Sequence, residues 1–282
     1  MTGRTVSQEM LRHEDDGIFL TTILARIREK RGLDFSGYRR NLLLRRVMAR
    51  VRLTKNQNFE EYLRCLDSDS GEIDKLLDAL TINVTEFFRD PAVFDVIEKR
   101  VIPELFAGKE GRVKIWSCAC SSGEEAYSLM MLMAEHCRTS KECPEFSILA
   151  TDIDRRSLEN AFHGGYGKAS LKNLSARLMQ ILQKYFHIVD EGFNIREDIS
   201  VPVEFRHHDI VSESPPGTFD MILCRNMLMY LDREQQRRVL EKFYEALNPG
   251  GFLVLGIVES TGGSFKERFA EYDIKSRIYL KI

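Results

Sequence analysis

Acidic side chains follow two apolar stretches of the sequence that have the length and composition of buried strands. Glu124 and Glu125 come after the stretch 112–117 and a run of small residues, 117–123, and Asp152 and Asp154 come at the end of the stretch 146–152. A loop of small residues lets a bound molecule approach the backbone closely. Two carboxylates in the first helical turn would repel a phosphate, although they suit the helix dipole and a cationic or hydroxyl-bearing ligand.

The ends of the other predicted strands extend this arrangement. Asp152 or Asp154 is placed to accept hydrogen bonds from both hydroxyls of a ribose, and Asp209, after the stretch 203–209, is placed to meet an adenine amino group. Together these residues favour a nucleoside ligand without phosphates, and S-adenosylmethionine, a cationic nucleoside, fits. Taken singly, Glu124 and Glu125 are also explained by helix initiation, and Asp152 by capping of the next helix.

The elements that must position these residues form two groups. Helical spacing of apolar residues predicts a small all-helical domain from four segments, 18–32, 38–53, 58–66 and 72–80. After Gly111 short apolar stretches alternate with helices, which predicts parallel βα units and therefore an α/β sheet with helices on both faces. No full helix separates the last two stretches, so the final strand is expected to be antiparallel. The predicted strands lie in 112–117, 146–152, 203–209, 219–225, 251–256 and 275–282.

Composition excludes several classes of protein. The chain has 282 residues, 43% of them hydrophobic, and a net charge of −2, which argues against a general nucleic-acid binder. No apolar run approaches the length of a membrane span or a signal sequence, so we expect a soluble, cytoplasmic protein. The six cysteines lack paired CxxC spacing and are expected to be reduced and mostly buried. His207 and His208 point to opposite sides of a strand, so no metal site is expected there.

Six sequence blocks, in this order and spacing, resemble the CheR family of chemoreceptor glutamate methyltransferases. They are TINVTEFFRD (81–90), SCACSSGEEAYS (117–128), ATDID (150–154), YF (185–186), FDMILCRNMLMYLD (219–232) and LNPGGFLVLG (247–256). The resemblance covers essentially everything after Ile18, and its first and fifth blocks are highly specific in combination. It implies a class I S-adenosylmethionine-dependent methyltransferase domain of Rossmann-like fold, with an inserted small antiparallel β-subdomain, preceded by an all-helical domain.

The resemblance also implies domain boundaries and an activity. We expect a flexible tail at 1–16, the helical domain at 17–84, a linker helix at 85–110 and the methyltransferase domain at 111–282, with a β-subdomain hairpin at 185–200. Family members transfer a methyl group from S-adenosylmethionine to receptor glutamates, which gives γ-glutamyl methyl esters and S-adenosylhomocysteine. The implied partners are the cytoplasmic methylation helices of chemoreceptors, with no nucleic acid, no membrane insertion and a monomeric enzyme.

Site residues carry over by matching position. The resemblance implies cofactor contacts from Asn83, Thr85, Arg89, Glu125, Asp152, Asp209, Ile210, Asn226 and Met227, and a catalytic role for Arg89 and Tyr230. Asn83 and Thr85 are alternatively helix caps, and Tyr230 is alternatively a packed aromatic. Arg89 lies beside two phenylalanines, so a carboxylate partner is expected for it.

A receptor carboxylate is already ionised at neutral pH, because the pKa of glutamate is about 4.3, so no general base is required. One departure from the family concerns the sequence GIVE at 256–259, where many members have Gly-His-Ser-Glu. The change puts a polar contact from this loop in doubt and leaves a second hypothesis open, a sensor or scaffold that binds S-adenosylmethionine without methyl transfer.

Receptor recognition is predicted to rest on the helical domain. The hairpin within 185–200, with a turn at Glu191 and Gly192, is shorter than the hairpins with which some family members capture a receptor peptide, so no such peptide is expected to bind. Arg39, Arg46 and Arg50 recur at spacings of seven and four, which predicts one substrate-binding helix face. A solvated surface face is the alternative. The segment 39–52 contains no acid to balance these arginines, and glutamate-rich receptor helices would complement their charge.

Overall fold

The computed structural model describes residues 13–56, 58–81, 83–140, 143–172, 174–189, 192–197 and 202–282. These residues form two compact units, and each is described by itself. One comprises the chain up to Asn83 together with Tyr230–Gln235, and the other comprises Val84–Met229 and Gln236–Ile282. Most of the tail expected at 1–16 lies outside the described residues. Within the described ranges, none of the helices combines the length and apolar character needed to cross a membrane.

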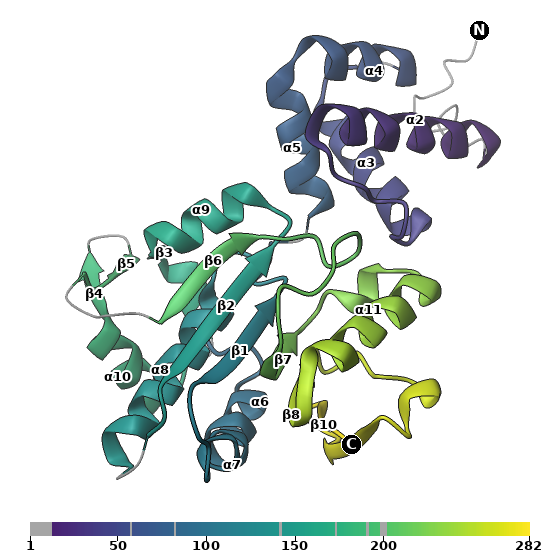
Figure 1. Ribbon diagram of the computed structural model, residues 1–282. Helices are drawn as coiled ribbons and strands as arrows, with labels where there is room; N and C mark the ends of the chain where they lie inside the picture. Colours follow the sequence, from purple (N-terminus) through teal and green to yellow (C-terminus); the bar gives the residue numbers. More distant parts are fainter. Residues whose placement is uncertain are drawn as a thin grey trace, which may run out of the picture. The chain divides into compact units, whose positions relative to one another are not determined.

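The first unit contains the four predicted helices. They are α2 (His13–Arg31), α3 (Arg40–Leu53), α4 (Phe59–Ser68) and α5 (Ser70–Leu80) (Figure 1). Asn58 and Asp69 cap the last two helices, because their side chains accept hydrogen bonds from the backbone N–H of Glu61 and Gly71. The apolar faces of all four helices meet in one core, which includes Leu20, Ile23, Ile27, Leu43, Val47, Tyr62, Leu66, Ile73 and Leu76.

The second unit is built on a seven-stranded mixed sheet with the strand order β6-β2-β1-β7-β8-β10-β9 (Figure 1). The strands are β1 (Val113–Cys118), β2 (Phe146–Asp152), β6 (Val203–His207), β7 (Phe219–Cys224), β8 (Leu247–Leu255), β9 (Phe269–Asp273) and β10 (Ile278–Lys281). Strands β6, β2, β1, β7 and β8 are parallel, whereas β10 is antiparallel to β8 as predicted. Strand β9 is an addition that the sequence did not indicate.

Helices cover both faces of this sheet, as predicted. Helix α8 (Glu124–Thr139) shares a core with the helical stretch α6 (Pro91–Val96), η1 (Ile97–Val101) and α7 (Ile102–Phe106), and Ile115 of β1 faces that core. The next residue of β1, Trp116, packs instead on Phe243 of α11 (Arg233–Ala246), with ring centroids 5.6 Å apart. This alternation follows from the two-residue period of a strand, and it explains why β1 is apolar on both sides.

A small three-stranded antiparallel sheet forms the predicted β-subdomain. Its order is β3 (Gly165–Gly167), β5 (Gly192–Ile195), β4 (Phe186–Val189). In the chain, β3 follows α9 (Arg155–His163), and β4 and β5 follow α10 (Ala176–Tyr185) and precede β6. The β4–β5 hairpin is confirmed, although the expected turn residue Glu191 and residues 198–200 lie outside the described part. A Cβ atom at Gly192 would overlap the carbonyl oxygen of Tyr166, so this position requires glycine.

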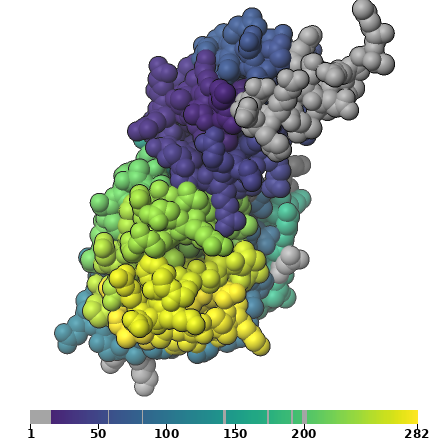
Figure 2. All heavy atoms as spheres, turned by 90° about the vertical axis from the view of Figure 1, so that its right-hand side faces the viewer, coloured from purple at the N-terminus to yellow at the C-terminus, as the bar shows by residue number. Residues whose placement is uncertain are grey.

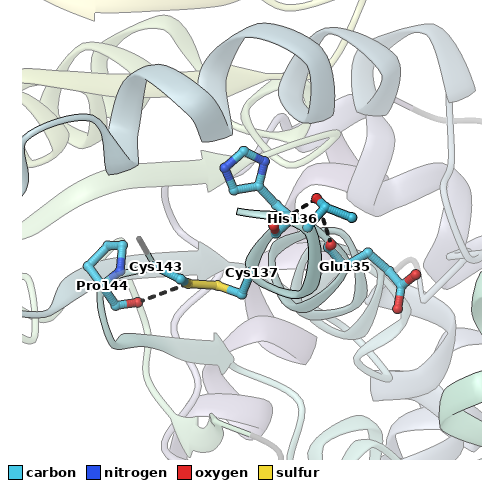
Figure 3. The surroundings of a disulfide bond; sticks show 6 residues. Glu135, His136, Cys137, Cys143 and Pro144 are labelled. Atoms are coloured by element: carbon cyan, nitrogen blue, oxygen red, sulfur yellow. Dashed lines mark hydrogen bonds between the residues drawn. A yellow bond between two sulfur atoms is a disulfide. The ribbon is translucent and has the colours of Figure 1, made fainter. Parts of the chain in front are cut away.

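The expectation that all six cysteines are reduced is wrong for one pair. Cys137, near the end of α8, forms a disulfide with Cys143 on the segment that leads into β2 (Figure 3). The chain turns back at the end of the helix, which brings the two Cα atoms within 5.1 Å, inside the range that a disulfide bridges. A spacing of six residues carries no such signal in sequence. The other four cysteines are free, and Cys118, Cys120 and Cys224 are buried.

Candidate active site

The small-residue loop after β1 is fixed to the end of β2. Ala119, Ser121 and Gly123 all have positive φ, at 60°, 51° and 92°. The backbone N–H of Ser121 donates to Asp152 Oδ2 at 2.7 Å, which holds the loop in this unusual conformation. A Cβ atom at Gly123 would lie 2.9 Å from the Cβ of Ala161, so only glycine fits where α8 begins. The loop therefore needs small residues for its backbone geometry as well as for ligand access.

Asp152 is the strand-end carboxylate and Asp154 is a helix cap. Asp154 Oδ1 accepts from the N–H of Arg156 at 2.9 Å at the start of α9, so the capping role considered for Asp152 belongs to its neighbour. Asp152 is buried, and its Oδ1 accepts from the N–H of Asp154 at 2.9 Å. Burial raises the pKa of Asp152 to about 6, against the opposing effect of its backbone hydrogen bonds. Each carboxylate oxygen retains a lone pair for a ligand hydroxyl.

Glu124 and Glu125 have different surroundings although they are adjacent. Glu124 accepts hydrogen bonds from the hydroxyls of Ser122 and Ser170, at 2.8 and 3.1 Å, and burial raises its pKa. Glu125 accepts from Ser117 Oγ at 2.9 Å and from a guanidinium N–H of Arg225 at 3.3 Å. Burial raises the pKa of Glu125, and the charge of Arg225 opposes this rise. Of the two glutamates, Glu125 is therefore the one that contacts a charged side chain at the strand ends, that of Arg225.

Arg225 is a site residue that the sequence reasoning missed. Its side chain is only 2% exposed at the end of β7 and is ion-paired with Asp90 at 2.7 Å and Glu125 at 3.3 Å. It also donates to the backbone carbonyl of Arg89 at 2.8 Å, and its guanidinium lies over the ring of Phe94. An arginine directly after the wholly apolar run MILC must be buried and paired, and that signal was present in the sequence.

The turn that carries Arg89 is strained and held at several points. Phe88 and Asp90 have φ values of 53° and 56°, which are uncommon for residues other than glycine. The N–H of Phe88 donates to Ser128 Oγ at 2.9 Å. Arg89 donates to the carbonyl of Val84 at 2.8 Å, and its positive charge opposes, to a small extent, the rise that burial causes in the pKa of Glu125. Among the described residues Arg89 forms no ion pair, so the carboxylate partner that the sequence predicted for it is not seen there.

Two further predicted contacts lie on this segment. Thr85 is partly buried in the second unit, whereas Asn83 is exposed in the first unit and donates to Thr81 Oγ1 at 3.4 Å. Their roles at the cofactor stay predictions.

Asp209 and Ile210 begin the segment after β6. Asp209 is buried and accepts from the N–H of Val211 at 2.9 Å and from Ser212 Oγ at 2.6 Å. Ile210 is buried beside it. The neighbouring His208 makes a hydrogen bond through Nε2 to the carbonyl of Ser214, and burial lowers the pKa of His207. Within the described residues, no group of three His, Cys, Asp or Glu side chains is arranged to hold a metal ion.

Glu259 anchors the turn after β7. Its Oε2 accepts from the N–H groups of Asn226 at 2.9 Å and Gly256 at 2.7 Å, and its Oε1 accepts from the N–H of Met229 at 3.1 Å. Asn226 has φ 62°, so this carboxylate also holds a left-handed residue in place. The GIVE loop thus keeps its polar contact through Glu259, while Ile257 and Val258 are exposed by 44% and 67%. Met227 follows Asn226 and is partly buried.

Tyr230 and the three predicted substrate arginines belong to the first unit. The carbonyls of Tyr230 and Leu231 accept from the N–H and Nε of Arg39, at 2.9 and 3.0 Å. Arg46 donates to the carbonyl of Ala79 at 2.9 Å, and its guanidinium lies 6.0 Å from the centre of the Tyr230 ring.

Arg50 forms a two-pronged ion pair with the buried Glu72 of α5, at 2.6 and 2.9 Å. The acid that segment 39–52 lacks is therefore supplied by another helix, which reasoning along one helix could not reveal. Arg39, Arg46 and Arg50 all make contacts inside the unit, so their predicted substrate role stays a prediction.

The residues at the strand ends fit a nucleoside cofactor. Ser121 Oγ and Asn226 Oδ1 are buried and have no hydrogen-bond partner among the described residues. A buried polar atom without a partner costs free energy, and a bound polar ligand would remove that cost. The two atoms follow β1 and β7, which are neighbours in the sheet, and Asp152 ends the adjoining β2. These groups offer hydrogen-bond acceptors and polar atoms of the kind that a nucleoside such as S-adenosylmethionine requires.

Comparisons with known proteins agree with this arrangement. The family described as "CheR methyltransferase, SAM binding domain" matches residues 83–278, and that described as "CheR methyltransferase, all-alpha domain" matches residues 20–81. A chemotaxis protein methyltransferase from Listeria monocytogenes is 33% identical over 86% of this chain and 89% of its own length. Chemotaxis protein methyltransferase 2 from Vibrio cholerae is 34% identical over 82% of both chains. The chemotaxis protein methyltransferase of Escherichia coli is 32% identical over 83% of this chain and 81% of its own length.

Proposed function

The chain belongs to the CheR methyltransferase family, which uses S-adenosylmethionine for methylation in chemotaxis, and from this premise we propose that it methylates glutamate side chains of chemoreceptors. The product would be a γ-glutamyl methyl ester on a cytoplasmic receptor helix. One observation carries the proposal: the chain pairs the all-alpha and cofactor-binding domains over most of the length of relatives named chemotaxis protein methyltransferases. A cytoplasmic location and a monomeric state are part of the same proposal.

The contacts of the strand-end carboxylates support a carboxylate acceptor. Asp152, Glu125, Asp209 and Glu259 all accept hydrogen bonds from groups of the chain itself. An alcohol or amine acceptor needs a base to remove its proton, whereas a glutamate with a pKa of about 4.3 is already an anionic nucleophile at neutral pH. A site whose carboxylates serve in binding and positioning suits an acceptor that needs no base.

When bound, S-adenosylmethionine supplies an electrophilic sulfonium methyl, which an acceptor oxygen takes up as the sulfur–methyl bond breaks and its electron pair stays on sulfur. The remaining contributions come from the chain. We propose that Asp152 binds the ribose hydroxyls of the cofactor. Its adenine ring would contact Asp209, Ile210, Asn226 and Met227. Arg89 would orient a carboxylate, and Tyr230 would donate a hydrogen bond close to the transferred methyl group. In-line alignment and removal of water from the acceptor then limit the rate.

Arg225 adds a positioning role to this scheme. Because it joins Glu125 to the strained turn at Arg89 and Asp90, it fixes the position of the Arg89 backbone relative to the strand ends. Removal of its side chain would leave Asp90 and Glu125 without their shared cation.

Methyl transfer to a receptor fragment tests the function directly. The protein would be incubated with S-adenosylmethionine labelled in its methyl group and a soluble cytoplasmic receptor fragment. Label on the receptor that base releases as methanol supports a glutamyl ester. The second candidate, a sensor or scaffold, is favoured by the exposed Ile257 and Val258 of the altered loop. Cofactor binding with no label on any receptor fragment would support that candidate and contradict ours.

A further inference from the structure

An open pocket of about 470 Å³ lies in the second unit, outside the strand-end site. Its walls come from the segment after Glu259 and from the strands β9 and β10 with their connecting turn. The lining includes the hydroxyl residues Ser260 and Thr261, the cations Lys266 and Arg277, and the acid Glu271. In Figure 2 the last part of the chain, coloured yellow, faces the viewer, and the residues that line the pocket belong to this part of the sequence.

The two cations of this pocket have unused hydrogen-bonding capacity. Lys266 is exposed, and within the described residues its ammonium group has no ion pair or hydrogen bond. Arg277 donates through Nε to the carbonyl of Ile257 at 3.1 Å, and no acid among the described residues is paired with its guanidinium. Glu271 lines the same pocket and forms no ion pair with either cation there, while Asp273 is already paired with Arg100 at 3.0 Å. The lining therefore carries a net positive charge.

The pocket is connected to the turn that follows β7. Glu259 binds the N–H groups of Asn226 and Met229, and the pocket lining begins at the next residue, Ser260. Two residues of chain span at most about 7 Å, so Thr261 lies within that distance of the Glu259 backbone. Arg277 in turn holds the carbonyl of Ile257. The short loop 256–261 thus connects the cationic pocket to the turn after β7, through hydrogen bonds made by Glu259 and Arg277.

Exposed apolar side chains stand on the loop 256–261. On this loop Ile257 and Val258 are exposed by 44% and 67%, and Met229, on the separate turn that Glu259 binds, is exposed by 37%. Large apolar side chains exposed together beside a polar pocket are typical of a surface that binds another protein. A helical acceptor that carries both acids and apolar residues would match both features.

We propose that Lys266 and Arg277 bind an acidic side chain of the receptor helix other than the glutamate that is methylated, while Ile257 and Val258 contact an apolar residue next to it. This inference rests on the proposed receptor substrate. One helical turn advances about 5.4 Å, so an acid one or two turns from the methylated glutamate lies about 5 to 11 Å along the receptor helix. This range is comparable with the span of at most about 7 Å between Glu259 and Thr261 of the pocket lining. The subsite would select among glutamates of a receptor by their acidic neighbours.

The test measures methyl transfer to a soluble cytoplasmic receptor fragment. Lys266→Gln is the primary variant, because Lys266 has no internal contact to lose among the described residues, and Lys266→Gln/Arg277→Gln is the stronger one. We expect KM for the fragment to rise about 3-fold in the single variant and up to about 10-fold in the double variant, as for exposed ion pairs. The turnover rate and the affinity for S-adenosylhomocysteine should stay within about 2-fold.

Lys168→Gln/Lys172→Gln is the matched control, since it removes the same charge from exposed residues that do not line the pocket. A charge swap adds specificity: Lys266→Glu should raise KM, and a fragment with lysine in place of one acid, one or two turns from the methylated glutamate, should restore it. If wild-type protein methylates the fragment and the Lys266 variants have an unchanged KM, or lose no more than the control, the subsite is wrong. If wild-type protein methylates no fragment, the proposed function itself fails.

Discussion

The strand ends of the sheet unit and helix α3 of the helical unit both gather charged side chains, but they differ in how far those charges are satisfied. At the strand ends, Asp152 retains acceptor capacity, and Ser121 Oγ and Asn226 Oδ1 are buried without partners among the described residues. On α3, the buried Glu72 binds two nitrogens of Arg50, whereas Arg46 donates to a backbone carbonyl through Nη1 and keeps a buried Nε that has no hydrogen-bond partner among the described residues. The strand ends therefore leave acceptors open to a ligand, whereas on α3 an internal acid binds Arg50 and the unused capacity is the buried donor of Arg46.

The largest expected effect is on the cofactor, and it comes from Asp152→Ala. Loss of two charge-assisted hydrogen bonds to ribose hydroxyls should weaken binding of S-adenosylhomocysteine by about 3 kcal/mol or more, which is over 100-fold. Calorimetric titration measures this affinity. Asp154→Ala is the control, because it removes the side-chain cap of α9 and should lower stability by about 1 kcal/mol with little change in affinity. Equal affinities of the Asp152 variant and wild type would mean that Asp152 does not bind the cofactor.

On α3 the comparison predicts a loss of stability instead. Glu72→Ala leaves the Arg50 guanidinium and the Tyr62 hydroxyl without their acceptor inside the helical core, and we expect unfolding free energy to fall by about 2–3 kcal/mol. Denaturant titration gives this value. Affinity of the folded protein for S-adenosylhomocysteine should be unchanged. A variant as stable as wild type would mean that the ion pair contributes little and that Arg50 is available to a substrate.

Tyr230 sharpens the comparison because its contacts place it in the helical unit, whereas Asn226 and Met229 belong to the sheet unit. If its hydroxyl acts at the transferred methyl, Tyr230→Phe should lower the turnover rate about 10-fold with little change in cofactor affinity. Steady-state kinetics with a receptor fragment separate the two quantities. Tyr230→Leu removes the ring that lies near Arg46 as well. If Tyr230→Phe has normal turnover and only Tyr230→Leu is impaired, Tyr230 is a packing residue.

The raised pKa of Asp152 predicts that both stability and cofactor affinity depend on pH. Burial raises the folded-state pKa to about 6 from 3.8, so the buried carboxylate destabilises the fold above pH 6, and protonation relieves this cost as pH falls through 6 towards 4. Cofactor binding has the opposite sign, since ribose hydroxyls donate to the ionised form. Affinity for S-adenosylhomocysteine should therefore fall by about 10-fold from pH 7 to pH 5. Burial raises the pKa of Glu125 as well, so Asp152→Asn is the control, and it should flatten most of this profile. A wild-type profile equal to that of Asp152→Asn would contradict the assignment.

The sequence predicted the fold more completely than the site, and particular residues show why. Helical spacing and short apolar stretches predicted the helices and most strands, because a helix on the surface buries one face and a strand of a covered parallel sheet buries both. Strand β9 escaped, since its residues FAEYD sit at the sheet edge and alternate weakly. The position of Asp152 at the end of β2 was predicted correctly, and its role at the cofactor stays a prediction. The partners of Arg225 and Arg50 were not, because Asp90, Glu125 and Glu72 are brought to them only by tertiary packing.

The smallest expected effect concerns arginines of α3 that have no such partners. Arg45 and Arg52 are exposed and seven residues apart, and within the described residues neither has a hydrogen bond or ion pair. Both positions therefore lie on one face of the helix. If α3 attracts an acidic receptor helix, Arg45 and Arg52 can pair with its acids without losing an internal contact. Arg45→Gln/Arg52→Gln should raise KM for a receptor fragment about 2- to 5-fold, with the difference disappearing at high salt, because exposed pairs are weak and screened. Arg46→Gln/Arg50→Gln is the comparison, and it should lower stability more than the first pair does. If the second pair raises KM at unchanged stability and the first pair does nothing, the receptor-binding face runs through Arg46 and Arg50 as the spacing of the sequence predicted.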